Sequence, residues 1–171
     1  MTKPRSWHLL GLTCLALLAG ATAQTGTQTP PPAPTETLPG PGPFTAESSA
    51  ARTQATKDGV TIQVIVRNTT SGAQTLSFSR NSQQNCAFAP HVRVLRVGTR
   101  EVVYPNPAAE GSICTQELRS ESVPGNGEHR LTRTLPLPAG EYMIEVWVRG
   151  FGGDDVGPVF IKAQPVRVTV K

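Results

Sequence analysis

Histidine, cysteine and aromatic residues are scarce in this chain of 171 residues. It holds three His, three Cys and 5% aromatic residues, and it lacks a Gly-x-Ser-x-Gly elbow, a phosphate-binding loop and a paired-carboxylate motif. Serines are present, but a serine without a neighbouring base is unreactive. We therefore predict that the protein is not an enzyme and uses no cofactor.

Because histidine and cysteine are scarce, few side chains could bind a metal ion. His91 and His129 have no second His, Cys or carboxylate at ligand spacing, so the sequence does not support a structural zinc site. Asp154 and Asp155 offer oxygens in a glycine-rich turn, but a calcium ion takes six or more oxygen ligands. We interpret these two aspartates as turn formers and predict no metal.

Long hydrophobic runs are also missing. The apolar stretch at residues 9–18 is far shorter than the roughly 20 residues that cross a bilayer. Lys3 and Arg5 precede this stretch, and Ala21 and Ala23 supply the small residues that a signal peptidase needs. Residues 1–23 are thus predicted to be a secretory signal peptide, cleaved after Ala23, and no membrane span is expected.

Export places the mature protein outside the cytoplasm, secreted or held in the periplasm or cell envelope. The alternative is lipidation of Cys14, but Thr13 stands where a small residue is usual beside a lipidated cysteine. Loss of Lys3 and Arg5 lowers the net charge from +4 to +2.

The remaining basic residues are scattered. The densest set, Arg93, Arg96 and Arg100, would be divided between the two faces of a strand, with few aromatic residues nearby. We predict no nucleic-acid surface.

Proline, threonine, glycine and alanine dominate residues 24–47. Proline fixes φ and removes a backbone donor, so this segment is predicted to be an extended linker. The rest of the chain, residues 48–171, has the length of one domain.

Period-two alternation runs through that domain. The clearest example is a pair of runs around a Pro-Ala-Gly corner, with Leu131 and Leu135 before it and Tyr142, Ile144 and Val146 after it. No convincing helical period is present. We predict an all-β, immunoglobulin-like antiparallel β-sandwich of about eight or nine strands, at residues 51–56, 60–67, 74–79, 92–96, 102–104, 113–121, 128–135, 142–149 and 159–170.

Tyr142 follows the corner at residues 137–140 in the manner of a tyrosine corner. We predict that its ring is buried and that its hydroxyl bonds the corner.

Two cysteines, Cys86 and Cys114, remain after cleavage of the signal peptide, so only one intramolecular pairing exists. Export favours their oxidation, and closing a loop of 114 − 86 = 28 residues contributes about 3.5 kcal/mol. The alternative, two free buried thiols, is rarely kept by an exported protein.

Asn68, with Thr69 and Thr70, matches the N-glycosylation pattern at the tip of a predicted hairpin. The preference of asparagine for turns accounts for the residue equally well.

Several motifs, in the same order along the chain, resemble the intracellular proteinase inhibitor family of the BsuPI type. They cover about residues 60–148 and are Val66-Arg67-Asn68-Thr69, Leu76-Ser77-Phe78-Ser79 with Gln83 and Gln84, Val92-Arg93-Val94 with Gly98 and Val103-Tyr104, Cys114-Thr115-Gln116-Glu117-Leu118, Pro124-Gly125 with Glu128, and Gly140-Glu141-Tyr142-Met143-Ile144. The resemblance implies an immunoglobulin-like sandwich and inhibition of a protease. Two features differ: this chain carries a signal for export, and Cys114 replaces an aromatic residue.

We therefore expect an exported, non-enzymatic protein-binding domain whose partner is a protease or another envelope protein. The alternative is a structural, carbohydrate-binding or cell-wall-associated envelope module, for which Trp147, Tyr104 and Phe151 are the only aromatic candidates.

Binding by a sandwich is expected at its loops, here residues 80–90, 105–112 and 150–158. The preferred candidate lies in the first loop, because Cys86 would brace it and a braced loop loses less entropy on binding. Its residues are Asn81, Ser82, Gln83, Gln84 and Asn85.

Overall fold

The computed structural model describes residues 38–153 and 157–171. The predicted signal peptide at residues 1–23, most of the predicted linker, and Asp154 and Asp155 lie outside the described residues.

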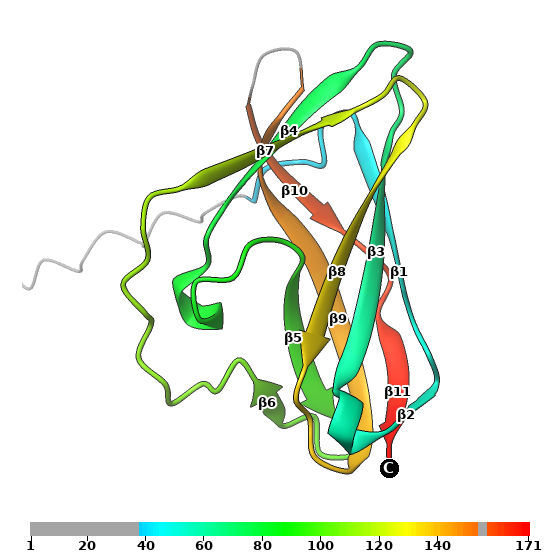
Figure 1. Ribbon diagram of the computed structural model, residues 1–171, viewed down its shortest axis with the longest axis vertical. Helices are drawn as coiled ribbons and strands as arrows, with labels where there is room; N and C mark the ends of the chain where they lie inside the picture. The colour runs from blue at the N-terminus through cyan, green and yellow to red at the C-terminus, as the bar shows by residue number, and fades with distance from the viewer. Residues whose placement is uncertain (1–37, 154–156) are drawn as a thin grey trace, which may run out of the picture. The chain divides into compact units, whose positions relative to one another are not determined.

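Two β-sheets face each other across one core (Figure 1). The smaller sheet has the order β1-β3-β8, and the larger has the order β2-β11-β9-β4-β7, with β10 and β5 also paired to β9 and β6 paired to β5. All of these pairs are antiparallel except β2 with β11. The protein is the predicted all-β sandwich. Its elements are β1 (Phe44–Ala50), β2 (Thr53–Gln54), η1 (Thr56–Asp58), β3 (Val60–Asn68), β4 (Gln74–Ser79), η2 (Ser82–Gln84), β5 (His91–Arg96), β6 (Val102–Tyr104), β7 (Leu118–Val123), β8 (Glu128–Leu135), β9 (Gly140–Gly152), β10 (Gly157–Lys162) and β11 (Val166–Val170).

The core is built from alternate residues of the two sheets. In β3 these residues are Val60, Ile62, Val64 and Val66, and in β9 they include Tyr142, Ile144, Val146 and Val148; all are fully buried. Full burial of one such side chain contributes about 1.5–3 kcal/mol. The alternation that predicted these strands therefore also identified the core.

The sandwich begins earlier than predicted. Strand β1 starts at Phe44, inside the segment predicted to be linker, and pairs along its length with β3. Phe44 is 1% exposed and belongs to the core. Because Phe44 is the only large apolar residue of β1 and follows several prolines, the strand leaves a weak signal in the sequence. The strand predicted at residues 51–56 is reduced to β2.

Two other predicted strands differ from the structure. The run at residues 159–170 is two strands, β10 and β11, separated by a segment that contains Pro165, which has no donor for a ladder. The strand predicted at residues 113–121 begins only at Leu118 and extends to Val123. The described residues therefore hold eleven strands rather than eight or nine.

Asn68 connects the β3–β4 turn to the turn between β7 and β8. Its side chain is 2% exposed. Its Nδ2 donates to the carbonyl oxygens of Gly72 at 2.7 Å and of Val123 and Pro124 at 3.1 Å. The nitrogen that a glycan would occupy is thus buried and bonded, so the folded domain presents no glycosylation acceptor at Asn68.

The tyrosine-corner prediction is confirmed: Tyr142 is fully buried, and its hydroxyl donates to the Pro138 carbonyl at 2.9 Å. Tyr142→Phe is expected to lower the free energy of unfolding by about 1 kcal/mol, because the Pro138 oxygen loses this partner. Urea denaturation measures the change, and an unaltered circular dichroism spectrum would show that the fold is retained. An unchanged midpoint would contradict a stabilising role for the hydroxyl.

Candidate functional site

Residues 80–90 and 105–117 lie together beside the sandwich (Figure 1), and we call this pair of segments the double loop. Cys86 and Cys114 join them at disulfide distance, with Cα atoms 5.4 Å apart. That separation is usual for a disulfide. The pairing expected from the cysteine count is therefore the one that the geometry supports.

The first segment is also closed by its own hydrogen bonds. Asn81 N donates to the Ala87 carbonyl at 3.0 Å, and Asn81 Oδ1 accepts from Gln83 N at 2.9 Å. The second bond caps the short η2 turn. Asn85 and Cys86, at φ 54° and 57°, reverse the chain after the turn. This part of the double loop has a defined local structure that does not depend on a ligand.

Gln84 belongs to the interior rather than to the binding surface. It is 2% exposed, and its Oε1 accepts from the backbone N of Val92 at 3.2 Å. Its carbonyl oxygen also accepts from Arg133 Nη2 at 3.4 Å. Of the five predicted contact residues, Gln84 is thus a structural residue, whereas Ser82, Gln83 and Asn85 are exposed and Asn81 is half-buried.

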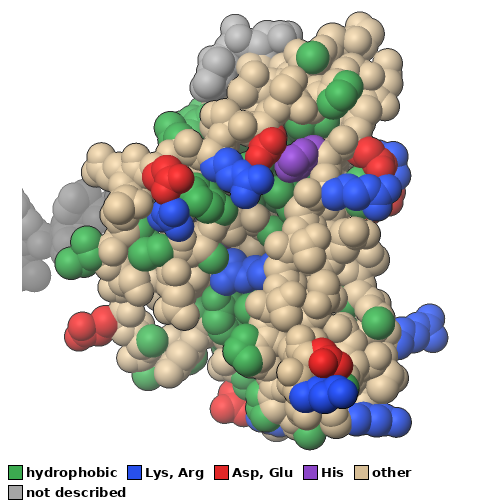
Figure 2. Space-filling view, viewed as in Figure 1, with side chains coloured by type: hydrophobic (Ala, Val, Ile, Leu, Met, Phe, Trp, Pro, Cys, Tyr) green, Lys and Arg blue, Asp and Glu red, His purple; other side chains and the backbone are tan. Residues whose placement is uncertain are grey.

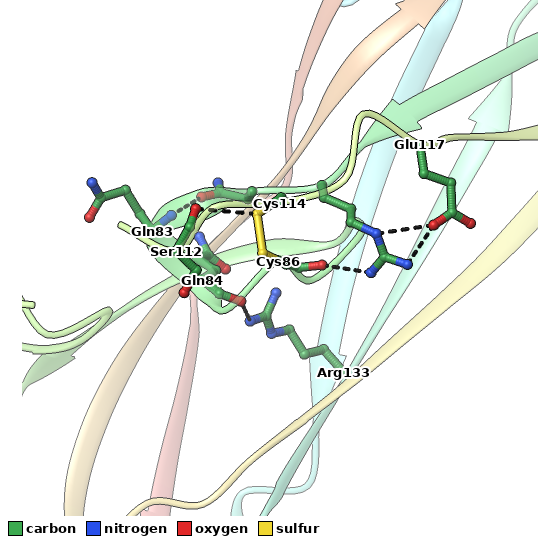
Figure 3. The surroundings of a disulfide bond; sticks show 9 residues. Gln83, Gln84, Cys86, Ser112, Cys114, Glu117 and Arg133 are labelled. Atoms are coloured by element: carbon green, nitrogen blue, oxygen red, sulfur yellow. Dashed lines mark hydrogen bonds and ion pairs between the residues drawn. A yellow bond between two sulfur atoms is a disulfide. The ribbon is translucent and has the colours of Figure 1, made fainter. Parts of the chain in front are cut away.

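Two arginines donate hydrogen bonds to the double loop: Arg80, which belongs to its first segment, and Arg133 of β8, which Figure 3 shows beside Gln84. Arg80 donates to Glu117 Oε2 through Nε at 3.1 Å and through Nη2 at 2.6 Å, and its Nη1 donates to the Cys86 carbonyl at 2.9 Å. From β8, Arg133 donates to the Pro90 carbonyl at 3.1 Å and to the Tyr104 hydroxyl. Burial lowers the pKa of Arg133, while Tyr104 opposes that shift. The disulfide and Arg80 therefore hold the two segments of the double loop to each other, and Arg133 ties the first segment to β8 by charged hydrogen bonds.

The second segment presents an apolar residue that the sequence prediction had placed in a strand. Ser112 N donates to the Ser82 carbonyl at 2.9 Å, which holds the two segments together at this point. The next residue, Ile113, has a side chain that is fully exposed, with a relative exposure of 103%. Ile113 lies one residue before the bridged Cys114. Its position next to this cysteine is the only sequence feature from which its place on the double loop could have been predicted.

A cavity of about 640 Å³ lies between the first segment of the double loop and the adjoining ends of β9 and β10. Ser79, Arg80 and residues 81–83 line it together with His91, residues 149–151 of β9, and Pro158. His91 is 3% exposed, and burial, followed by the charges of Arg133 and Arg149, lowers its pKa to about 4. The third predicted loop, residues 150–158, contributes to this cavity, but its first three residues belong to β9 and its last two to β10.

A second hollow of about 530 Å³ lies between residues 84–89 and β8, on the face seen in Figure 2. Tyr104 and Phe88 line this hollow, whereas Phe151 lines the first cavity. Trp147 is half-buried beside His91, with ring centroids 6.2 Å apart. The three aromatic residues considered for carbohydrate binding therefore do not line one common cavity.

Charged side chains of both signs lie side by side over the face in Figure 2. Exposed ion pairs of the domain include those of Glu128 with Arg67 and Arg130. Within residues 38–153 and 157–171, no three His, Cys, Asp or Glu side chains are grouped as a metal site would need. The same residues include no helix that is long and apolar enough to cross a membrane.

Comparisons with known proteins give no family for this chain. No protein family and no curated protein matches the sequence. A crystal structure described as "X-ray structure of Northeast Structural Genomics Consortium target SoR45" matches with a TM-score of 0.38 and 9% identity, over 74% of this chain and 84% of that one.

Proposed function

We propose that this protein is an exported binding domain that recognises another protein through the exposed edge of the double loop, with Ile113 as the apolar anchor. The observation that carries this proposal is the full exposure of Ile113 on a segment that is fixed by the disulfide. A fixed segment loses little conformational entropy when it binds.

The energetics favour an anchor of this kind. Moving an isoleucine side chain from water into a partner's pocket contributes about 1.5–3 kcal/mol. Ser82, Gln83 and Asn85 are exposed on the neighbouring segment and offer polar groups for the rim of such an interface. A central apolar residue with polar neighbours is the usual composition of a protein-binding patch.

The most specific form of the proposal is inhibition of an extracellular protease. Residues 112–117 belong to no strand, and all of them except Cys114 are exposed. A protease takes an exposed chain segment into its cleft and selects one side chain in a specificity pocket. Ile113 suits an apolar pocket, and the resemblance to the proteinase inhibitor family supports the same function.

Ile113→Ser is expected to weaken inhibition of an elastase-type protease about tenfold or more, because the apolar contact is lost. Inhibition constants measured with purified elastase-type and trypsin-type proteases test this. Ile113→Arg should move inhibition toward the trypsin-type enzyme, whose pocket binds a cation.

Leu118→Ser is the matched control, since Leu118 is also exposed, at 58%, but lies in β7. It should leave inhibition unchanged. Inhibition by wild-type protein that survives Ile113→Ser would remove the double-loop anchor. Wild-type protein that inhibits no protease would remove the inhibitor form, and equal capture of envelope proteins by wild type and Ile113→Ser would favour the structural envelope module.

A further inference from the structure

We propose that the cavity beside the double loop is a binding site for the carboxylate of an apolar or aromatic acid. Such a group is present at the C-terminal residue of a peptide and in a free acid of the same kind. The cavity volume, about 640 Å³, is within the range of pockets that hold small organic ligands. The site does not include Ile113, the proposed protein-binding anchor, but it shares Ser82 and Gln83 with the rim of that interface.

The charge of the lining residues selects an anion. Arg80 and Arg149 line the cavity, and no acidic residue is among the described lining residues. Arg80 is already paired with Glu117. Arg149, by contrast, is exposed and has no ion-pair partner within the described parts of the chain. A free guanidinium group binds a carboxylate strongly because it donates two parallel hydrogen bonds.

His91 is a second, independent indication of a polar ligand. Its ring lines the cavity and is almost fully buried, yet its Nδ1 has no hydrogen-bond partner in the structure. A buried polar atom without a partner costs free energy. The positive charges of Arg133 and Arg149 add to burial in keeping the ring neutral. A carboxylate bound by Arg149 would offset that charge and accept a hydrogen bond from the N–H of the imidazole ring.

Apolar residues of β9 and β10 account for the apolar part of the ligand. Phe151 is 42% exposed at the end of β9, and Pro158 and Val159 line the cavity beside it. An inorganic anion would leave Phe151 and Pro158 in contact with water, whereas an aliphatic or aromatic body would cover them. On the polar side, Ser82 and Gln83 offer hydrogen bonds to an amide group when the ligand is a peptide.

The test is an NMR titration of the purified protein with 3-phenylpropanoate, with its amide, and with acetyl-Ala-Phe bearing a free or an amidated C-terminus. Saturable shifts at His91 and Phe151 are expected with the two acids, at dissociation constants below about 10 mM, and not with the two amides. Arg149→Gln should raise the dissociation constants about tenfold or more.

Arg52→Gln is the matched control, because it removes the same charge from an exposed residue between β1 and β2 that does not line the cavity. Ile113→Ser should also bind the acids as wild type does, which separates this site from the proposed function. Tighter binding of the peptide than of 3-phenylpropanoate would identify a peptide C-terminus, and equal binding would identify a free acid. Binding of the amides, equal affinities of Arg149→Gln and Arg52→Gln, or no saturable binding of either acid would each overturn the proposal.

Discussion

Replacing Cys86 and Cys114 together by alanine is expected to lower the free energy of unfolding by about 3.5 kcal/mol. The bridge closes a loop of 28 residues, and its loss restores conformational freedom to the unfolded chain. Urea denaturation of the variant beside wild type measures the difference.

Wild-type protein with its disulfide reduced is the control, because it keeps both side chains and lacks only the bond. It should lose about the same free energy as the double variant. Both forms should retain the sandwich, since the core residues of β3 and β9 lie outside the double loop. A loss below about 1 kcal/mol would contradict the prediction and would mean that the unfolded chain without the bridge retains structure that limits its gain in entropy.

Features that depend on short stretches of sequence were predictable. Val60, Ile62 and Val64 alternate without interruption, and β3 and β8 have bounds close to those expected from the pattern. The corner bond of Tyr142 was also predictable, because the ring and its acceptor Pro138 are only four residues apart. In these places the local sequence and the tertiary structure favour the same conformation.

Features that depend on contacts between distant residues were not predictable. Gln84 lies in a polar segment typical of a solvent-exposed loop, but hydrogen bonds from Val92 and from Arg133 on β8 make it an interior residue. Ile113 was predicted to begin the strand that leads into β7, but the disulfide at Cys114 and the bond from Ser112 N to Ser82 hold this segment against residues 82–86 instead. The sequence analysis placed the candidate site in the first segment and did not mark Ile113, the exposed apolar residue of the second segment.

His91 is the clearest example of this limit, because its environment comes from three strands. It lies in β5, Arg133 in β8 and Arg149 in β9, and Trp147 of β9 packs beside its ring. Burial is the largest cause of its low pKa, and the two arginine charges add to it. The sequence shows only that His91 lacks neighbours at metal-ligand spacing, so its burial and its low pKa could not be predicted from it.

The stability of the protein is accordingly expected to fall on acidification. Below its unfolded pKa of about 6.5, the unfolded His91 takes up a proton that the folded protein, with a pKa of about 4, does not bind. The unfolded state therefore binds more protons in this window, and the free energy of unfolding decreases as the pH falls from about 6.5 to 4. Between pH 7 and 4.5 the contribution of His91 amounts to about 2.5 kcal/mol.

His91→Gln tests this prediction, because glutamine keeps a polar side chain that does not titrate. Urea denaturation at several pH values should give the variant a shallower decline between pH 7 and 4.5 than wild type, smaller by about 2.5 kcal/mol. His129→Gln is the matched control, since it removes a histidine from β8 rather than the ring beside Arg149 and Trp147. Parallel declines for wild type and His91→Gln would show that His91 is protonated as readily in the folded protein as in the unfolded chain. That result would also mean that the His91 ring beside the cavity is not held neutral in the folded protein. A shallower decline in His91→Gln alone would support a neutral ring at the proposed carboxylate site.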